Sequence, residues 1–177
     1  MSLEIERKFR IKMPEKEWLR SREGVAATGL VQCYLTAREG WERRVRQATN
    51  ALTGEVRCTL TEKTEEAALV RTELEKEISQ NEYEALLEEM LPDTPPLYKV
   101  RWAFPYEGHT IEIDCYPFWE NEAILEVELS SPEEAFSLPP EITVLADVTG
   151  DPNLKNRALA LAMTQWKKDL AEYPENQ

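Results

Sequence analysis

The sequence predicts an α+β fold built around eight strands, with a few short helices and one longer helix near the C-terminus. Eight segments alternate apolar and polar side chains with the period of two that is typical of strands. Turn-forming residues separate several of these segments, for example residues 38–40 and 107–108. Helix-capping sequences and one helical apolar pattern account for the remaining elements.

The first predicted strand, residues 4–8, places Glu4, Glu6 and Lys8 on one face. Neighbouring carboxylates repel each other, so this pair favours a bound cation, and hard divalent ions prefer oxygen ligands. A proline near the start of residues 14–23 then predicts a short helix.

Residues 31–36 and 41–47 predict the second and third strands, joined by a short turn. The third strand carries Arg44 and Arg46 on one face, because residues two apart in a strand point the same way. Guanidinium groups paired in this way favour an anionic ligand such as phosphate.

The fourth strand, residues 55–63, alternates apolar and polar side chains and ends at Lys63. The fifth strand, residues 70–78, carries a row of carboxylates that includes Glu73 and Glu75 on one face. The last three strands likewise carry apolar residues on one face and charged residues on the other. Their charged residues are Lys99 and Arg101 in residues 97–106, Glu112 and Asp114 in residues 110–116, and Glu126 and Glu128 in residues 123–129.

Three capping sequences predict the later helices. Ser79 and Glu82 form a capping box before an apolar stripe that ends ahead of Pro92. Ser131 followed by a proline and two acids predicts another short helix, and Asp151 precedes the C-terminal helix of residues 153–170.

The charges on the strands are sorted by sign. Acids dominate the first, fifth, seventh and eighth strands, whereas the third, fourth and sixth are basic. A merely solvated sheet would mix signs within a strand, because like charges two residues apart gain nothing from each other. If the sheet closes, its charged faces line a hydrated interior with basic walls for phosphate and acidic walls for metal, while apolar faces pack against outer helices.

Length and composition set further limits. The chain of 177 residues is long enough for one domain with a substantial core, so residues 1–177 are interpreted as a single domain. A net charge of −13 argues against nucleic acid or an anionic membrane as a partner. The sequence has no apolar leader or membrane-spanning run, which predicts a cytoplasmic protein, and its three cysteines are interpreted as reduced thiols.

The ordered set of charged motifs resembles that of the CYTH superfamily, the triphosphate tunnel metalloenzymes. Residues Glu4-Ile5-Glu6-Arg7-Lys8 match the family's ExExK signature. The other motifs that resemble the family are, in order, Gln32-Cys33-Tyr34-Leu35, Arg44-Val45-Arg46, Leu60-Thr61-Glu62-Lys63, Arg71-Thr72-Glu73-Leu74-Glu75, Lys99-Val100-Arg101, Glu112-Ile113-Asp114 and Glu126-Val127-Glu128. ExExK alone is a weak signal, but the ordered set spans nearly the whole chain.

The resemblance implies an eight-stranded antiparallel β-barrel, a tunnel that binds a triphosphate, with flanking helices and a C-terminal helix. It also implies that Mg²⁺ or Mn²⁺ is the cofactor for hydrolysis or rearrangement of that triphosphate. The implied phosphate-binding residues are Lys8, Arg44, Arg46, Lys63, Lys99 and Arg101. The implied metal ligands are Glu4, Glu6, Asp114, Glu126 and Glu128, with Glu73 and Glu75 in support. The implied catalytic group is Glu4, Glu6, Lys8, Glu126 and Glu128.

The leading predicted activity is hydrolysis of inorganic tripolyphosphate to pyrophosphate and phosphate, because the chain is little more than the tunnel. The alternatives are a class IV adenylate cyclase, a thiamine triphosphatase and, from another class, a non-catalytic module that binds polyphosphate or nucleotide. The aromatic residues that could stack an organic ring at a tunnel mouth are Trp41, Trp102, Tyr116 and Trp119. The expected partner is a small-molecule triphosphate, and a homodimer is an open alternative.

Glu126 and Glu128 are expected to crowd like charge around the metal site. If they do, Glu126→Gln should relieve repulsion and leave the stability of the metal-free protein unchanged.

Overall fold

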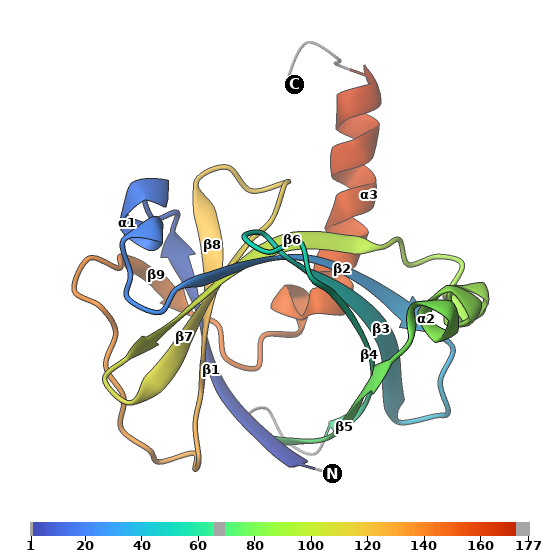
Figure 1. Ribbon diagram of the computed structural model, residues 1–177, viewed down its shortest axis with the longest axis horizontal. Coiled ribbons are helices and arrows are strands. Elements are labelled where there is room, and N and C mark those ends of the chain that lie inside the picture. The colour runs from blue at the N-terminus through green and yellow to red at the C-terminus, as the bar shows by residue number, and fades with distance from the viewer. Residues whose placement is uncertain (1, 66–69, 173–177) are drawn as a thin grey trace.

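The computed structural model describes residues 2–65 and 70–172, with side chains described for residues 5–64 and 72–165. In this part of the chain, nine strands form one sheet with a few helices around it (Figure 1). The strands are β1 (Ser2–Lys12), β2 (Ala26–Leu35), β3 (Trp41–Asn50), β4 (Val56–Glu65), β5 (Val70–Ile78), β6 (Leu97–Tyr106), β7 (His109–Cys115), β8 (Glu122–Glu128) and β9 (Val144–Asp147). The helices are α1 (Lys16–Arg20), α2 (Gln80–Leu86) and α3 (Asn156–Glu172), with the 3-10 helices η1 (Leu87–Glu89) and η2 (Pro152–Leu154).

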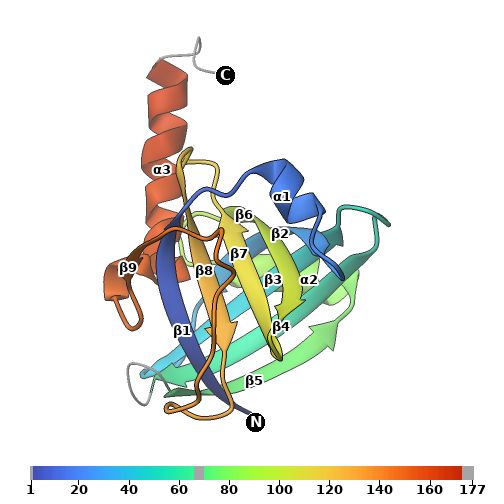
Figure 2. The same cartoon turned by 90° about the vertical axis from the view of Figure 1, so that its left-hand side faces the viewer.

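Neighbouring strands are antiparallel throughout this sheet. They are hydrogen-bonded in the order β5-β4-β3-β2-β6-β7-β8-β1-β9, and β5 also pairs with β1. Residues 2–5 of β1 pair with residues 70–73 of β5, whereas residues 6–12 pair with β8. The sheet therefore curls until β5, the strand at one end of this order, meets the first part of β1 (Figures 1 and 2).

The eight strands lie where the sequence predicts them, and the antiparallel arrangement is confirmed. The predicted eight-stranded barrel needs two corrections. A ninth strand, β9, pairs with the middle of β1, and the contact between β1 and β5 is limited to four residue pairs. The sequence does not predict β9, because four residues are too few to display a period of two.

The helix predicted to begin at Ser131 is wrong. Residues 130–143 hold turns and irregular segments, and the carboxylate of Glu134 lies 3.0 Å from Nε2 of His109 instead of capping a helix. This segment crosses the outer surface and contributes Phe136 to the core. Serine, proline and acids stabilise turns as well as helix starts, so tertiary packing decided between the two.

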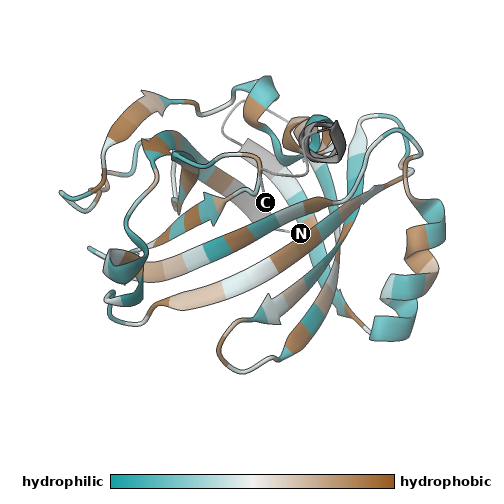
Figure 3. Cartoon of the chain, turned by 90° about the horizontal axis from the view of Figure 1, so that it is seen from above, coloured by the Kyte–Doolittle hydropathy of each residue, from teal (hydrophilic) through white to brown (hydrophobic). Residues whose placement is uncertain are grey.

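Three apolar clusters hold the sheet together. The first packs the outer faces of β1, β7 and β8 against α1 and the segment before β9, and the third packs β2, β3 and β4 against α2. The second lies between α3 and one end of the sheet. Figure 3 shows hydrophobic and hydrophilic residues alternating along the strands. Because alternate side chains point to opposite faces, the apolar residues occupy the outer face of the sheet and the inner face is left for charged groups. Among the described residues, no helix is long and apolar enough to cross a membrane.

Candidate active site

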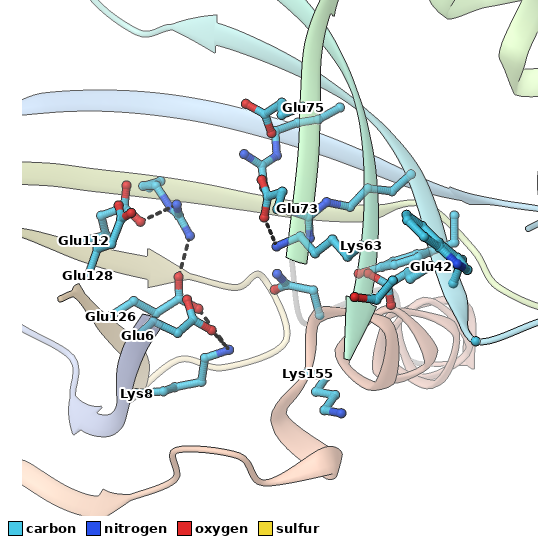
Figure 4. A pocket seen from close by; sticks show the side chains of 18 residues that line it. Glu6, Lys8, Glu42, Lys63, Glu73, Glu75, Glu112, Glu126, Glu128 and Lys155 are labelled. Carbon is cyan, nitrogen blue, oxygen red and sulfur yellow. Dashed lines mark hydrogen bonds and ion pairs between the residues drawn. The ribbon is translucent and has the colours of Figure 1, made fainter. Parts of the chain in front are cut away.

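The inner face of the curled sheet encloses a cavity of about 510 Å³ (Figure 4). Its lining comes from strands far apart in the sequence and from the start of α3. The predicted site residues that line it are Glu6, Lys8, Arg44, Arg46, Lys63, Glu73, Glu75, Arg101, Glu126 and Glu128. The side chain of Glu4 lies outside the described residues.

Strand register explains why acids gather on one wall. Glu6 lies directly opposite Glu128 across β1 and β8, and Lys8 lies opposite Glu126. On the other edge of β8, Glu126 lies opposite Glu112 of β7. Directly opposed like charges destabilise an antiparallel pair, so these positions favour a cation between them.

Glu126 is held by two cations of the protein itself. Lys8 Nζ lies 3.0 Å from Oε1, and Arg101 Nη2 lies 2.9 Å from Oε2. Burial would raise the pKa of Glu126, but attraction to Lys8, Arg101 and Lys99 outweighs burial and holds the pKa well below its usual range. The expectation of crowded like charge is therefore wrong for Glu126 in this state, where it is an ion-pair partner.

Asp114 and Lys99 lie behind the cavity wall. Both side chains are fully buried, with Lys99 Nζ 2.5 Å from Asp114 Oδ2. Arg101 donates from Nε to Oδ1 and from Nη2 to Oδ2 of Asp114, each at 2.7 Å. Burial would raise the pKa of Asp114, but Arg101 and Lys99 outweigh it and lower that pKa, while burial lowers the pKa of Lys99 to about 8. Asp114 thus orients Arg101, whose Nη1 then reaches Glu112 at the cavity.

The opposite wall is basic and comes from β3 and β4, with acids from β5 beside it. Arg44 is buried at the lining, and Lys63 Nζ lies 2.6 Å from Glu73 Oε2. Thr61 Oγ1 donates to Glu75 Oε2 at 2.9 Å. Glu73 therefore pairs with a cation of the basic wall, whereas Glu75 accepts from a neutral hydroxyl.

Several lining residues were not assigned from the sequence, among them Glu112, Lys155 and Asn156. Asn156 begins α3, and its Oδ1 accepts hydrogen bonds from Tyr116 Oη at 3.0 Å and from Lys99 Nζ at 3.4 Å. The capping sequence before α3 marks a helix start, but nothing in it indicates that this start reaches the cavity.

One of the four aromatic residues considered for ring stacking lines the cavity. This residue is Trp41, and the guanidinium carbon of Arg38 lies 3.8 Å from the centre of its ring. Tyr116 and Trp119 pack against each other in the cluster under α3, with ring centres 5.6 Å apart. Trp102 packs against the first apolar cluster. Three of the four rings are therefore used in packing.

The acidic wall has the oxygen donors that Mg²⁺ or Mn²⁺ prefers. Glu6 and Glu128 face each other from adjacent strands and both line the cavity, so they fit two ligands of such an ion. Within the described ranges, no group of three or more acidic, histidine or cysteine side chains is arranged to hold a metal. Mg²⁺ usually keeps several water ligands, so two carboxylates suit it.

The chain is similar to known proteins in sequence and in fold. No family model matches the chain. A segment of 100 residues, 56% of the chain, is 34% identical to the inorganic triphosphatase of Acetivibrio thermocellus and spans 63% of that protein. The crystal structure of an inorganic triphosphatase matches with a TM-score of 0.56 and 29% identity, covering 91% of this chain and 96% of that one. A protein from Pyrococcus horikoshii shares the fold, with a TM-score of 0.53 and 20% identity over 73% of this chain and 80% of its own.

The curled antiparallel sheet, with basic and acidic inner walls that face each other, has the form expected of a tunnel for a polyanion. Two of the relatives described above are triphosphatases, one similar in sequence and one in structure. The chain therefore resembles the CYTH superfamily, the triphosphate tunnel metalloenzymes, in its ordered motifs and in its fold.

Proposed function

We propose that this protein is a metal-dependent triphosphatase that hydrolyses inorganic tripolyphosphate to pyrophosphate and phosphate, with residues 1–177 acting as one tunnel domain. The observation that carries the proposal is the division of one cavity into a basic wall and an acidic wall. The names of the two relatives described above support the same substrate class.

The basic wall would bind the phosphate chain. Arg44 and Arg46 can each present a planar fork of donors to phosphoryl oxygens, and Lys63 adds a compact charge. Lys8 and Arg101 lie across the cavity, so the chain's own cations would contact the substrate from two sides. Holding the substrate in this way orients the scissile phosphoryl group for in-line attack.

The acidic wall would hold the metal. Bound Mg²⁺ or Mn²⁺ would supply a Lewis acid that polarises the phosphoryl group and lowers the pKa of a water molecule. Glu6 and Glu128 are the proposed ligands in the described wall, with Glu4 and Glu126 completing the set. Asp114 is proposed as a positioning residue for Arg101, because its two oxygens already accept from Arg101 and Lys99 behind the wall.

Inorganic tripolyphosphate is the proposed substrate because the described lining offers a single indole, Trp41, and Arg38 already covers it. Phosphate release should be measured with tripolyphosphate, ATP and thiamine triphosphate, each with Mg²⁺ and with EDTA, beside an assay for cyclic AMP. We expect tripolyphosphate to be hydrolysed fastest, and only with the metal. Cyclic AMP as the main product would instead identify a cyclase, and saturable binding without turnover would identify a binding module.

Arg44→Ala should raise KM for tripolyphosphate by about 10- to 100-fold, since hydrogen bonds to charged groups contribute about 1.5–3 kcal/mol each. A smaller loss in kcat is expected, because charge on the phosphoryl oxygens changes in the transition state. Steady-state kinetics at saturating Mg²⁺ would measure both constants.

The matched control is Arg43→Ala. Arg43 is the adjacent residue of β3 and pairs with Glu62 and Glu89 outside the cavity, so its loss should leave both constants within about twofold of wild type. Equal effects of the two substitutions would mean that Arg44 does not contact substrate.

A further inference from the structure

A buried amide lies behind the basic wall. The side chain of Gln32 in β2 is fully buried, and its Nε2 donates to Tyr34 Oη at 2.7 Å. Its Oε1 accepts from Nε and Nη2 of Arg46, at 3.3 Å and 3.2 Å. Strand register explains these contacts, because Gln32 lies directly opposite Arg46 across β2 and β3.

The orientation of this amide is determined by its partners. A guanidinium group has only donors, so the oxygen of Gln32 must face Arg46 and its NH₂ group must face away. The residue Tyr34 is 1% exposed, and its hydroxyl is the acceptor that the NH₂ group needs. Gln32 is therefore held in one orientation by a residue two positions along its own strand.

Arg46 differs from three other cavity cations in the charge of its partner. The cations that pair with carboxylates are Lys8, Lys63 and Arg101. In the described part of the chain, the hydrogen bonds of Arg46 go to the neutral oxygen of Gln32. Burial and the repulsion of Arg44 and Arg101 lower the pKa of Arg46 to about 10, against the weaker attraction of the carboxylates of Glu75 and Asp114.

We propose that Gln32 is a positioning residue that aims Arg46 at the triphosphate and, being neutral, leaves the full positive charge of Arg46 to the substrate. Two of the five guanidinium N–H groups bind the amide oxygen, which leaves three for phosphoryl oxygens. A carboxylate in place of the amide would hold the guanidinium equally well but would neutralise it. This inference rests on the proposed function and names a determinant of affinity within that site.

Gln32→Glu tests whether the neutral charge of Gln32 matters for binding, because the substitution keeps the shape and the acceptor oxygen of the side chain while adding a negative charge. Binding of inorganic tripolyphosphate should be measured by calorimetry in EDTA, where no metal-dependent turnover occurs. We expect the dissociation constant to rise about 10- to 100-fold, which is the range for losing a charge-assisted contact. A dissociation constant equal to that of wild type would overturn the proposal.

Gln47→Glu is the matched control. Gln47 follows Arg46 in β3, points to the outer face and donates to Gln80 Oε1 at 3.1 Å. The substitution adds the same charge to the protein next to Arg46 but outside the cavity, so the dissociation constant should change less than about twofold. An equal loss in both variants would mean that net charge, not the contact with Arg46, controls binding.

A double-mutant cycle separates positioning from general structural support. Once Arg46→Met has removed the guanidinium, adding Gln32→Glu should weaken binding by less than about twofold. Additive losses would show that Gln32 acts independently of Arg46, and the proposal would fail.

Melting temperatures measured without ligand test the role of Gln32 separately from the proposed function. Gln32→Glu should be tolerated while Arg46 pairs with the new carboxylate, but the melting temperature should fall by several degrees more when Arg46→Met strands that buried charge. An additive change in melting temperature would refute the contact itself. Failure of the wild-type protein to bind tripolyphosphate would instead refute the proposed function, while this melting cycle would still decide whether Gln32 is coupled to Arg46.

Discussion

Asp114→Asn should lower the free energy of unfolding by about 3–5 kcal/mol, the usual cost of removing one partner of a buried ion pair. Asp114 is fully buried and accepts from Lys99 and from two nitrogens of Arg101. An asparagine side chain cannot accept hydrogen bonds from both guanidinium nitrogens in the same way, because one of its two carboxylate oxygens is replaced by a donating NH₂ group. Lys99 would lose the carboxylate that it pairs with, Arg101 would lose one of three, and urea denaturation in EDTA would measure the loss of stability.

Asp147→Asn provides the control for the same chemical change. Asp147 pairs with Arg7, but its side chain is 45% exposed, so solvent screens the pair and the substitution should cost less than about 1 kcal/mol. If Asp114→Asn unfolds like wild type yet alters the metal dependence of hydrolysis, then Asp114 is a metal ligand, as the family resemblance implies, and not a positioning residue.

Glu126→Gln should lower kcat/KM for tripolyphosphate by at least about 100-fold, as expected when one group that stabilises charge in the transition state is removed. The same substitution should also destabilise the metal-free protein by about 1.5–3 kcal/mol, because hydrogen bonds to Lys8 and Arg101 lose their charge assistance. This second result is the opposite of the sequence-based expectation. Kinetics with Mg²⁺ and thermal melts in EDTA would test both parts.

Glu122→Gln is the control in the same strand. Glu122 pairs with Arg10 at 3.1 Å, but the side chains are 38% and 42% exposed, so little change in stability or activity is expected. A Glu126→Gln protein that melts well below wild type but hydrolyses tripolyphosphate normally would make Glu126 a purely structural residue.

Short sequence patterns predicted correctly the elements that interactions between residues close in the sequence stabilise. The capping box at Ser79 is formed in both directions, with Ser79 Oγ accepting from the Glu82 N–H at 3.1 Å and the Glu82 carboxylate accepting from the Ser79 N–H at 2.8 Å. The similar pattern at Ser131 failed because the apolar contacts of Phe136 hold that segment against the outer face of the sheet. Contacts distant in sequence can override a local preference, and a single sequence does not display them.

The order of the strands in the sheet likewise could not be predicted from short sequence patterns. β2 pairs with β3, its neighbour in sequence, but also with β6, and β1 pairs with β8, β9 and β5. The distant pairing of β1 with β8 brings Lys8 to Glu126, whereas the contact of Gln32 with Arg46 comes from the neighbouring strands β2 and β3. The aromatic candidates show the same limit, since the composition of a strand does not indicate which ring lies inside the cavity.

By itself, the sequence determined which side chains share a face, because a period of two is a property of each strand alone. It therefore predicted that Glu112 and Asp114 point the same way from β7. Only the tertiary structure decided that they differ in role. Asp114 lies opposite Arg101 of β6 and is buried behind the wall, whereas Glu112 lies opposite Glu126 of β8 and lines the cavity. The two residues are separated by one position in the same strand, and the register of the neighbouring strands sets the charge that each one faces.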